Sequence, residues 1–421
     1  MTTIPRFNDA RDWFLQKRFG LFIHWGLYAL GEWHEQEQFR FPVPRDQYAA
    51  QMAHFNPVRY NPDEWLDIVQ AAGMEYVTFT SKHIDGFCMF DSAQTDYKIT
   101  NTPYGRDTLA MMAEACQRRG VTLCIYYSVA DMHHPNYPSA GRSYERPGPE
   151  AGDEPNLDKY LSYVEAQVRE LCTNYGPIGA FWWDANVMKV VDPRFRALIR
   201  SLQPAALLNG RGFDGEWPAD QPGDFNTPER DYDNTGEQAL AFTKPTEACQ
   251  SVGIESWGYR AFEDYYSDAY LIRSIDRMMA KGANYLLNVG PQADGTLPPE
   301  ATRILGVAGE WYNRVKESFV EVEPATELTA NRDVLLTRRG NTLYVHCHTP
   351  PKGTAVILAP LATQPRSATL LNTGEPVQTR LERLPERYLD EGSCLRLYNL
   401  PVNEHPDTAL VVKLEFDGDI A

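Results

Sequence analysis

The sequence lacks several features that define other classes of protein. It has no apolar run of about 18 residues, so we expect no transmembrane helix. Its 7 cysteines are scattered and include no CxxC pair, which is typical of free thiols in a reducing compartment. The N-terminal segment has no apolar core of the kind found in secretory signal peptides. We therefore expect a cytoplasmic protein.

Motifs for phosphate, zinc and serine-hydrolase chemistry are also missing. We find no glycine-rich phosphate loop, no HExxH pair and no GxSxG elbow. His133 and His134 are adjacent, and neighbouring side chains of an extended segment point in opposite directions, which disfavours a shared metal. We expect neither a metal nor an organic cofactor.

Positive charge is scarce, whereas aromatic residues are abundant. The chain has 40 Lys and Arg against 57 Asp and Glu, a net charge of −17. Such a surface repels phosphate backbones and anionic lipids, so we expect no nucleic acid and no membrane partner. Aromatic residues make up 12% of the chain, including 9 Trp and 23 Tyr. Because aromatic faces stack on the C–H faces of neutral, hydroxyl-rich ligands, this composition favours a carbohydrate ligand.

The order of the apolar runs predicts an α/β protein. Strand-like runs such as FGLFIHW, YVTFTSKH, VTLCIYYS and IGAFWWDAN alternate with longer helical patterns through the first ~310 residues. This alternation predicts a parallel sheet with crossover helices, and its units fit a (β/α)8-like TIM barrel, which we place at residues 1–322. From residue 323 to 421 the pattern has a period of two, which predicts a C-terminal antiparallel β-sandwich.

Polar and aromatic residues stand where the predicted strands end. In a barrel of this kind the catalytic groups lie at the carboxyl ends of the strands, so these side chains meet at one face. Each alone has a structural explanation, such as a helix cap for Asp184. Together they indicate one pocket in which carboxylates lie among indoles, which is an arrangement typical of a glycosidase. The strand ends carry His24–Trp25, Lys82–His83, Tyr126–Tyr127, Trp182–Asp184 and Asn209–Arg211.

Several segments of the chain are similar to one known family. In chain order they are FGLFIHWG, SKHIDGFCMFDSAQTDY, CIYYS, FWWDAN, DFNTPE, TEACQSVGIESWGYR and NYLLNVGPQADGTLPPE. Across roughly residues 8–320 they resemble the retaining α-L-fucosidases of glycoside hydrolase family 29. The resemblance implies a (β/α)8-like barrel with a C-terminal β-sandwich. It also implies that the protein releases terminal α-L-fucose from glycosides or oligosaccharides through a covalent glycosyl-enzyme intermediate, without a cofactor.

The resemblance further implies the catalytic pair. The family's nucleophile closes a strand in a Trp-x-Asp pattern, and here that residue is Asp184. The acid/base matches either Glu229, in DFNTPE, or Glu247, in TEAC, and we favour Glu229. The second match is weaker because many relatives read Trp-Glu-x-Cys, whereas this chain has Thr246 before the glutamate. A retaining pair needs its carboxyl groups about 5–5.5 Å apart.

The sugar-binding wall is implied by position, with one departure. Relatives usually read Lys-His-His-Asp-Gly-Phe, and here Ile84 replaces the second histidine. Because Ile84 cannot bond a hydroxyl, either another loop supplies that contact or the sugar preference differs. Two alternatives stay open: a catalytically silent carbohydrate-binding protein on the same scaffold, and a retaining glycosidase or transglycosidase for a fucose-like sugar. The implied wall consists of His24, Glu32, Trp33, His83, Tyr127, Trp182, Arg211 and Trp257.

Overall fold

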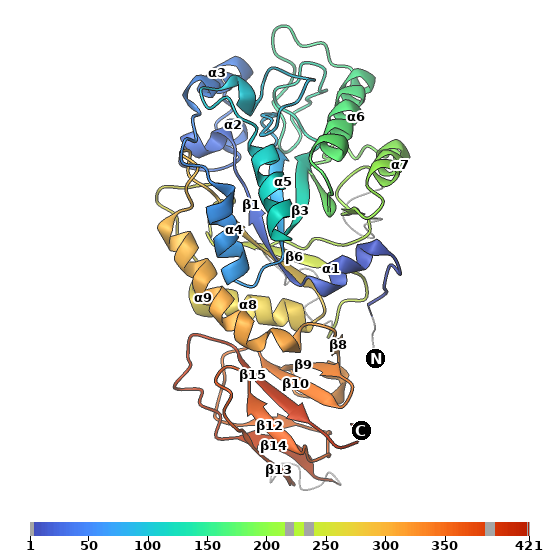
Figure 1. The fold of residues 1–421 in the computed structure, drawn as a ribbon, viewed down its shortest axis with the longest axis vertical. Helices are drawn as coiled ribbons and strands as arrows, with labels where there is room; N and C mark the ends of the chain where they lie inside the picture. The colour runs from blue at the N-terminus through green and yellow to red at the C-terminus, as the bar shows by residue number, and fades with distance from the viewer. Residues whose placement is uncertain (1–3, 215–222, 231–239, 384–391, 419, 421) are drawn as a thin grey trace.

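The computed structural model describes the whole chain except residues 1–3, 215–222, 231–239, 384–391, 419 and 421. In Figure 1 an α/β part, which runs from the N-terminus to α9, stands on a smaller part built of antiparallel strands. The candidate site belongs to the α/β part.

The α/β part is built around a seven-stranded parallel sheet with the strand order β5-β4-β3-β2-β1-β7-β6. The central strands are buried along their whole length, as expected where crossover helices cover a parallel sheet. Because the strands are parallel, their carboxyl ends meet at one edge. Their bounds are β1 Phe19–Ile23, β2 Tyr76–Lys82, β3 Thr122–Ser128, β4 Ala180–Asp184, β5 Leu207–Leu208, β6 Glu247–Ser251 and β7 Asn284–Val289.

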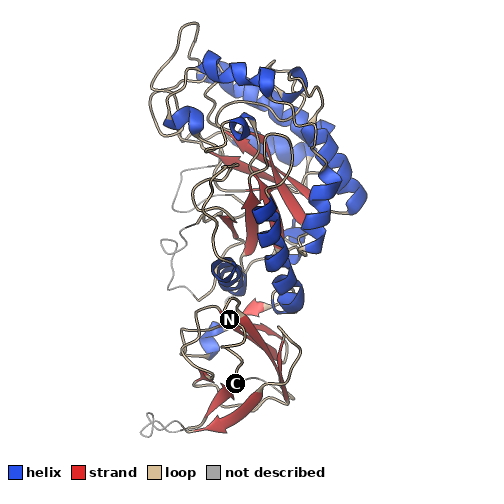
Figure 2. Ribbon diagram, turned by 90° about the vertical axis from the view of Figure 1, so that its left-hand side faces the viewer, coloured by secondary structure: helices blue, strands red, loops and turns tan. Residues whose placement is uncertain are grey.

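Helices pack along the outside of this sheet (Figure 2). Asn61 before α4, Asp107 before α5 and Asp192 before α7 each accept a hydrogen bond from a backbone N–H of the first turn, which fixes where these helices begin. No helix in the described ranges is long and apolar enough to cross a bilayer. The helices are α1 Trp13–Gln16, α2 Glu37–Arg40, α3 Arg45–Ala49, α4 Pro62–Ala71, α5 Thr108–Arg119, α6 Leu157–Asn174, α7 Pro193–Leu202, α8 Asp268–Ala280 and α9 Pro299–Val315.

The two edge strands of the sheet are linked by a segment that forms no regular strand. Isolated parallel bridges join Asn209 to Phe225, Asn226 to Thr246, and Glu229 to Cys249. Residues 225–229 therefore lie between the end of β5 and β6, in the position of an eighth strand. The described residues thus form a curled sheet of seven regular strands, not eight, and the segment that bridges its edges carries Glu229.

The second part of the chain is a pair of antiparallel sheets. The sheets have the orders β12-β15-β10-β9-β8 and β11-β14-β13. Both contribute to one apolar core, which includes Leu343 and Val345 of β10 and Leu395 and Leu397 of β14. The strands are β8 Glu323–Pro324, β9 Leu335–Arg339, β10 Thr342–Cys347, β11 Val356–Leu358, β12 Ser367–Leu370, β13 Gln378–Glu382, β14 Cys394–Tyr398 and β15 Leu410–Glu415.

The opposite face of the larger sheet packs against α8 and α9 (Figure 1). His346 Nδ1 of β10 lies 2.7 Å from Asp276 Oδ1 of α8, and neither side chain is exposed. Trp311 Nε1 of α9 donates a hydrogen bond of 2.9 Å to the carbonyl of Ala409. The second part is therefore joined to the α/β part through buried polar contacts as well as apolar packing.

Candidate active site

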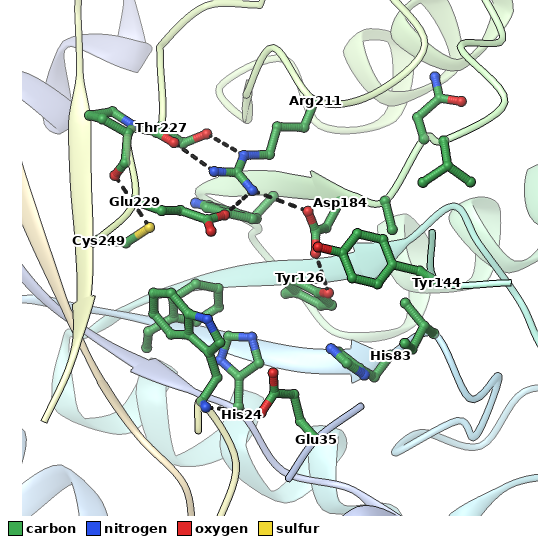
Figure 3. Close-up of a pocket in the computed structure, with 18 of the residues that line it drawn as sticks. His24, Glu35, His83, Tyr126, Tyr144, Asp184, Arg211, Thr227, Glu229 and Cys249 are labelled. Atoms are coloured by element: carbon green, nitrogen blue, oxygen red, sulfur yellow. Dashed lines mark hydrogen bonds and ion pairs between the residues drawn. The ribbon is translucent and has the colours of Figure 1, made fainter. Parts of the chain in front are cut away.

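A cavity of about 870 Å³ lies at the carboxyl edge of the parallel sheet. Figure 3 shows side chains from successive strand ends directed into it. Ile84, which departs from the family pattern, also lies on its wall. The expected site residues that line the cavity are His24, His83, Trp182, Asp184, Arg211, Glu229 and Trp257.

Asp184 is the last residue of β4, and its carboxylate is held from two sides. Tyr126 Oη donates a hydrogen bond of 2.7 Å to Oδ2, and Arg211 Nη1 lies 3.2 Å from Oδ1. Burial and the neighbouring Asp184 raise the pKa of Tyr126 well above its usual range, so this phenol stays protonated and donates. The Asp184 side chain keeps 27% of its surface exposed to the cavity. The carboxylate is therefore fixed in direction yet accessible to a ligand.

Arg211 connects the two catalytic candidates. Its Nε and Nη2 each donate a hydrogen bond of 2.7 Å to Thr227, to the hydroxyl and the carbonyl respectively. Its guanidinium also lies over the Trp182 ring, 4.6 Å from the centroid. Burial opposes the charge of Arg211, but the carboxylates of Glu229 and Asp184 outweigh it and raise the pKa of Arg211 above its usual range. This cation is therefore permanent and rigidly placed.

Glu229 and Asp184 contact the same nitrogen of that guanidinium. Nη1 of Arg211 forms an ion pair with Glu229 Oε1 and with Asp184 Oδ1 (Figure 3). The two oxygens can be no farther apart than two hydrogen-bond lengths, roughly 6 Å. This limit fits the separation of about 5–5.5 Å that retaining glycosidases need, and it lies below the inverting range of about 6.5–9.5 Å.

Glu247, the other acid/base candidate, does not line the cavity. It is 3% exposed and lies inside the sheet, where Tyr76 Oη donates to Oε2 at 2.7 Å and Trp182 Nε1 donates to Oε1 at 2.9 Å. Burial raises the pKa of Glu247 to about 7. Both carboxyl oxygens are thus engaged with protein groups, and one of them holds the Trp182 indole that forms part of the cavity wall.

Two histidines form the deep end of the cavity. Asn288 uses its amide nitrogen to donate to the Trp257 carbonyl, so its Oδ1 accepts from His24 Nδ1 at 2.7 Å. This assignment leaves His24 Nε2 as an acceptor in the neutral ring. Burial and the nearby His24 lower the pKa of His83 to about 3, so His83 is also neutral. Its Nδ1 has no hydrogen-bond partner among the described residues.

Glu35 is a cavity carboxylate that the sequence analysis missed. Ser256 Oγ, the Trp257 N–H and the Gly258 N–H all donate to its Oε2, at 2.8, 2.9 and 3.3 Å. Burial opposes ionisation of Glu35, but His34 and the other neighbouring groups outweigh burial and lower its pKa. Its Oε1 is buried and has no partner within the described part of the chain. Glu35 therefore anchors the Trp257 segment and offers one free acceptor.

Two residues expected beside the ligand lie elsewhere. Glu32 is exposed, with a left-handed backbone (φ 51°), and its carbonyl accepts a hydrogen bond from the Ala261 N–H. Trp33 is half-buried and packs on Phe41, with ring centroids 4.4 Å apart. Neither lines the cavity, and Glu35, a few residues further along the same loop, takes that place. The loop turns in a way that residue types alone do not specify.

Tyr127 is also turned away from the cavity. Its Oη donates to Gln167 of α6 at 2.6 Å, whereas Tyr126 faces Asp184. The strand register explains this placement, because Tyr126 pairs with Trp182 and Tyr127 pairs with Trp183 across β3 and β4. Side chains alternate across a strand, so residues that share a face with Trp182 and Asp184 are the ones that reach the cavity. This register belongs to the folded sheet, so residue type alone does not choose between the two tyrosines.

No group of three or more His, Cys, Asp or Glu side chains in the described residues is arranged to hold a metal ion. The polar atoms that converge on the cavity are instead two carboxylates, a guanidinium, two neutral imidazoles and the free oxygen of Glu35, placed beside the indoles of Trp182 and Trp257. Such a set can bind several hydroxyl groups and an apolar face of one small ring.

Comparison with known proteins confirms the family predicted from the motifs. Residues 4–317 match the family model described as Alpha-L-fucosidase. Human tissue alpha-L-fucosidase is 26% identical over 438 residues, which covers 96% of this chain and 88% of that protein. Alpha-L-fucosidase isoenzyme 1 from Paenibacillus thiaminolyticus is 33% identical with a TM-score of 0.83, covering 97% of this chain and 100% of that structure. An alpha-L-fucosidase from Lactobacillus casei, solved with α-L-fucose, is 28% identical with a TM-score of 0.63, over 74% of this chain and 100% of that one.

The family model spans more than half of the sequence, and the Paenibacillus enzyme aligns with nearly all of it. The chain therefore belongs to the α-L-fucosidase family of glycoside hydrolases.

Proposed function

We propose that this protein is a retaining exo-α-L-fucosidase that releases terminal α-L-fucose from glycosides or oligosaccharides. The observation that carries this proposal is the contact of Asp184 and Glu229 with one guanidinium nitrogen of Arg211 inside the cavity. A single sugar ring bound there would place its anomeric carbon between the two carboxyl groups.

The reaction proceeds by two displacements. Asp184 attacks the anomeric carbon and forms an ester, while Glu229 gives its proton to the glycosidic oxygen and the bond to the leaving group breaks. Glu229 then removes a proton from a water molecule, whose oxygen attacks the same carbon and displaces Asp184. Each displacement inverts the carbon, so the product keeps the α configuration.

Arg211 stabilises the first transition state through its position. During that step Asp184 loses negative charge and Glu229 gains it, and Nη1 contacts both carboxylates. Arg211 can therefore stabilise negative charge on either carboxylate without moving. Tyr126 keeps the second oxygen of Asp184 in place, so the first oxygen is the one that faces Arg211 and the sugar.

Sugar recognition is assigned to the free polar atoms of the deep wall. His24 Nε2 and Glu35 Oε1 accept hydrogen bonds from sugar hydroxyls, and His83 supplies a further contact through Nδ1. Trp182 and Trp257 present apolar surface to the C6 methyl group. A neutral deoxysugar suits this chain, because a net charge of −17 disfavours anionic substrates.

A silent carbohydrate-binding protein would not need two accessible carboxylates on one cation, and we therefore give hydrolysis precedence.

In this proposal the curled sheet acts as a (β/α)8-like barrel whose mouth holds the site, and the terminal sheets form a β-sandwich that supports it. We further propose that the enzyme works in a reducing, cytoplasmic compartment, since all seven cysteines are buried and none of them forms a disulfide.

The test is a panel of aryl α-L-fucoside, α-L-galactoside and β-D-galactoside with purified protein. We expect turnover of the α-L-fucoside above the other two, and NMR spectra of the first turnovers should show α-L-fucose before mutarotation. Activity confined to a sugar of another configuration would contradict the substrate assignment. Initial appearance of the β-anomer would contradict the retaining mechanism.

A further inference from the structure

A long loop between β3 and α6 places one aromatic side chain on the cavity wall. Residues 129–156 leave the sheet after Ser128 and return at the start of α6. Tyr144 is the residue of this segment that lines the cavity. Figure 3 shows its ring beside Asp184 and Tyr126, on the side of the cavity that also holds His83.

The residues that follow Tyr144 anchor the loop. Glu145 is buried and accepts hydrogen bonds from Tyr137 Oη at 2.6 Å, from the Ala140 N–H at 3.0 Å and from Arg142 Nε at 2.8 Å. Arg146 is 2% exposed and pairs with Asp153 at 2.7 Å. These contacts form a rigid base, so the position of Tyr144 is set by the protein before any ligand binds.

Tyr144 itself has an unusual backbone and a free hydroxyl. Its φ of 67° lies in the left-handed region, which a bulky residue adopts only where surrounding contacts enforce it. Its ring packs against Phe39, with centroids 5.8 Å apart. The hydroxyl forms no hydrogen bond with another described residue. Burial, together with the charges of Asp184 and Glu229, raises the pKa of Tyr144, so the phenol is a permanent donor.

The turn after β2 supplies no side-chain donor to this cavity at position 84. Ile84 lines the wall and has only an apolar side chain to offer. The Ile84 carbonyl accepts a hydrogen bond of 2.7 Å from the Met132 N–H, so the turn after β2 is tied to the start of the Tyr144 loop. The loop thus brings a phenol to a cavity in which Ile84 supplies no donor.

We propose that Tyr144 is a specificity-determining residue that donates a hydrogen bond to the sugar hydroxyl beside the anomeric carbon, the C2 hydroxyl, in place of the contact that Ile84 cannot make. This inference rests on the proposed fucosidase function. Asp184 attacks the anomeric carbon, and Tyr144 stands next to Asp184. The leaving-group oxygen lies on the face of the anomeric carbon opposite the attacking Asp184, so a donor beside Asp184 meets either the C2 hydroxyl or the ring oxygen. Donation to the ring oxygen would oppose the positive charge that develops there in the transition state, so the C2 hydroxyl is the favourable partner.

The experiment compares Tyr144→Phe with the wild type on 4-nitrophenyl α-L-fucoside and on its 2-deoxy analogue. The substitution removes one oxygen and keeps the ring on Phe39. We expect kcat/KM for the fucoside to fall about tenfold or more, and kcat/KM for the 2-deoxy substrate to stay within about twofold of the wild type. Tyr104→Phe serves as the matched control, because the Tyr104 hydroxyl bonds Met111 and does not line the cavity.

Each outcome has one interpretation. An equal loss of kcat/KM on both substrates would mean that the Tyr144 hydroxyl contacts the leaving group or supports the loop. No loss on either substrate would mean that the hydroxyl makes no contact that matters for the reaction. Both results would overturn the inference. Far-ultraviolet circular dichroism and the urea midpoint of Tyr144→Phe should match the wild type, which separates a contact from a folding defect. A wild-type protein that is inactive on the fucoside would instead refute the proposed function.

Discussion

The choice between Glu229 and Glu247 can be decided with two isosteric variants, Glu229→Gln and Glu247→Gln. Glu229 keeps 38% of its side-chain surface exposed in the cavity, whereas Glu247 is 3% exposed beneath Trp182. If Glu229 transfers the proton, its loss should lower kcat/KM by about 10²–10⁴-fold for substrates whose leaving group needs protonation. The same variant should keep far more of its activity on α-L-fucosyl fluoride, because fluoride departs without a general acid.

Glu247→Gln should behave as a structural change. The glutamate accepts from both Tyr76 and Trp182, and a glutamine offers one oxygen and one amide nitrogen in their place. One of the two hydrogen bonds must be remade or lost, at a cost of about 1–3 kcal/mol. Because Trp182 keeps its place on the wall through the other bond, we expect less than a tenfold change in kcat/KM, and the same change for every leaving group.

The assay is kcat/KM across aryl α-L-fucosides of graded leaving-group acidity, with sodium azide as a second readout. Glu229→Gln should show a steep dependence on the leaving group, and azide should accelerate it and yield α-L-fucosyl azide, because the anion attacks the glycosyl-enzyme without a general base. The reasoning would be refuted if Glu247→Gln showed the steep dependence and the azide product while Glu229→Gln resembled the wild type.

Three further predictions follow from contacts of single residues. Asp184→Gly should abolish turnover, and azide should restore it. The product should be β-L-fucosyl azide, since one displacement then replaces two. Failure of azide to rescue a folded variant would contradict the nucleophile role of Asp184. Burial raises the pKa of Glu247 from 4.5 to about 7, so between these values the folded state retains a proton that the unfolded state releases. The free energy of unfolding should therefore fall by about 3 kcal/mol from pH 4.5 to 8. Urea titrations of Glu247→Gln should lack this fall, and parallel pH profiles of the free energy of unfolding in the wild type and the variant would refute the prediction. Lys82→Met should lower the free energy of unfolding by about 3–5 kcal/mol, because Asp131, 2.8 Å from Lys82 Nζ and 1% exposed, would lose its partner. Adding Asp131→Asn should recover much of that loss in the same titration, and no recovery would argue against the ion pair as the cause.

Six of the seven regular strands described in the α/β part could be predicted from the sequence because they are short, apolar and buried, whereas β6 reads EACQS and does not stand out as an apolar run. The runs FGLFIHW, YVTFTSKH and IGAFWWDAN contain β1, β2 and β4. The eighth position of the sheet could not be predicted, since residues 225–229 read FNTPE, with a proline and no apolar alternation. Their place is set by isolated bridges to both edge strands, which are tertiary contacts without a local signal.

The candidate catalytic residues could be located from the sequence, whereas parts of the cavity wall could not. Asp184, Arg211 and Glu229 lie at strand ends or in a recognisable motif, and the structure brings all three together. Tyr126 and Tyr127 are both aromatic and both buried, so burial and residue type cannot decide which one faces inward; the register of β3 against β4 decides it. The position of the Glu35 side chain in the cavity depends on how its loop turns, and no periodic pattern in the sequence predicts that turn.

Glu247 and Glu229 differ because Glu247 lies in a regular strand and Glu229 does not. Glu247 belongs to a regular strand, and the pleat directs it inward, where Tyr76 and Trp182 occupy both of its oxygens. Glu229 belongs to a segment with isolated bridges only, so its backbone can approach Arg211 without satisfying a full ladder. A proton donor must reach a substrate oxygen and then a water molecule, and a carboxyl group committed to two protein donors can do neither. The irregular segment 225–229 thus leaves a candidate acid/base residue, Glu229, available at this edge of the sheet. Replacing Pro228 with a residue that favours a regular strand should lower turnover more than it lowers the free energy of unfolding.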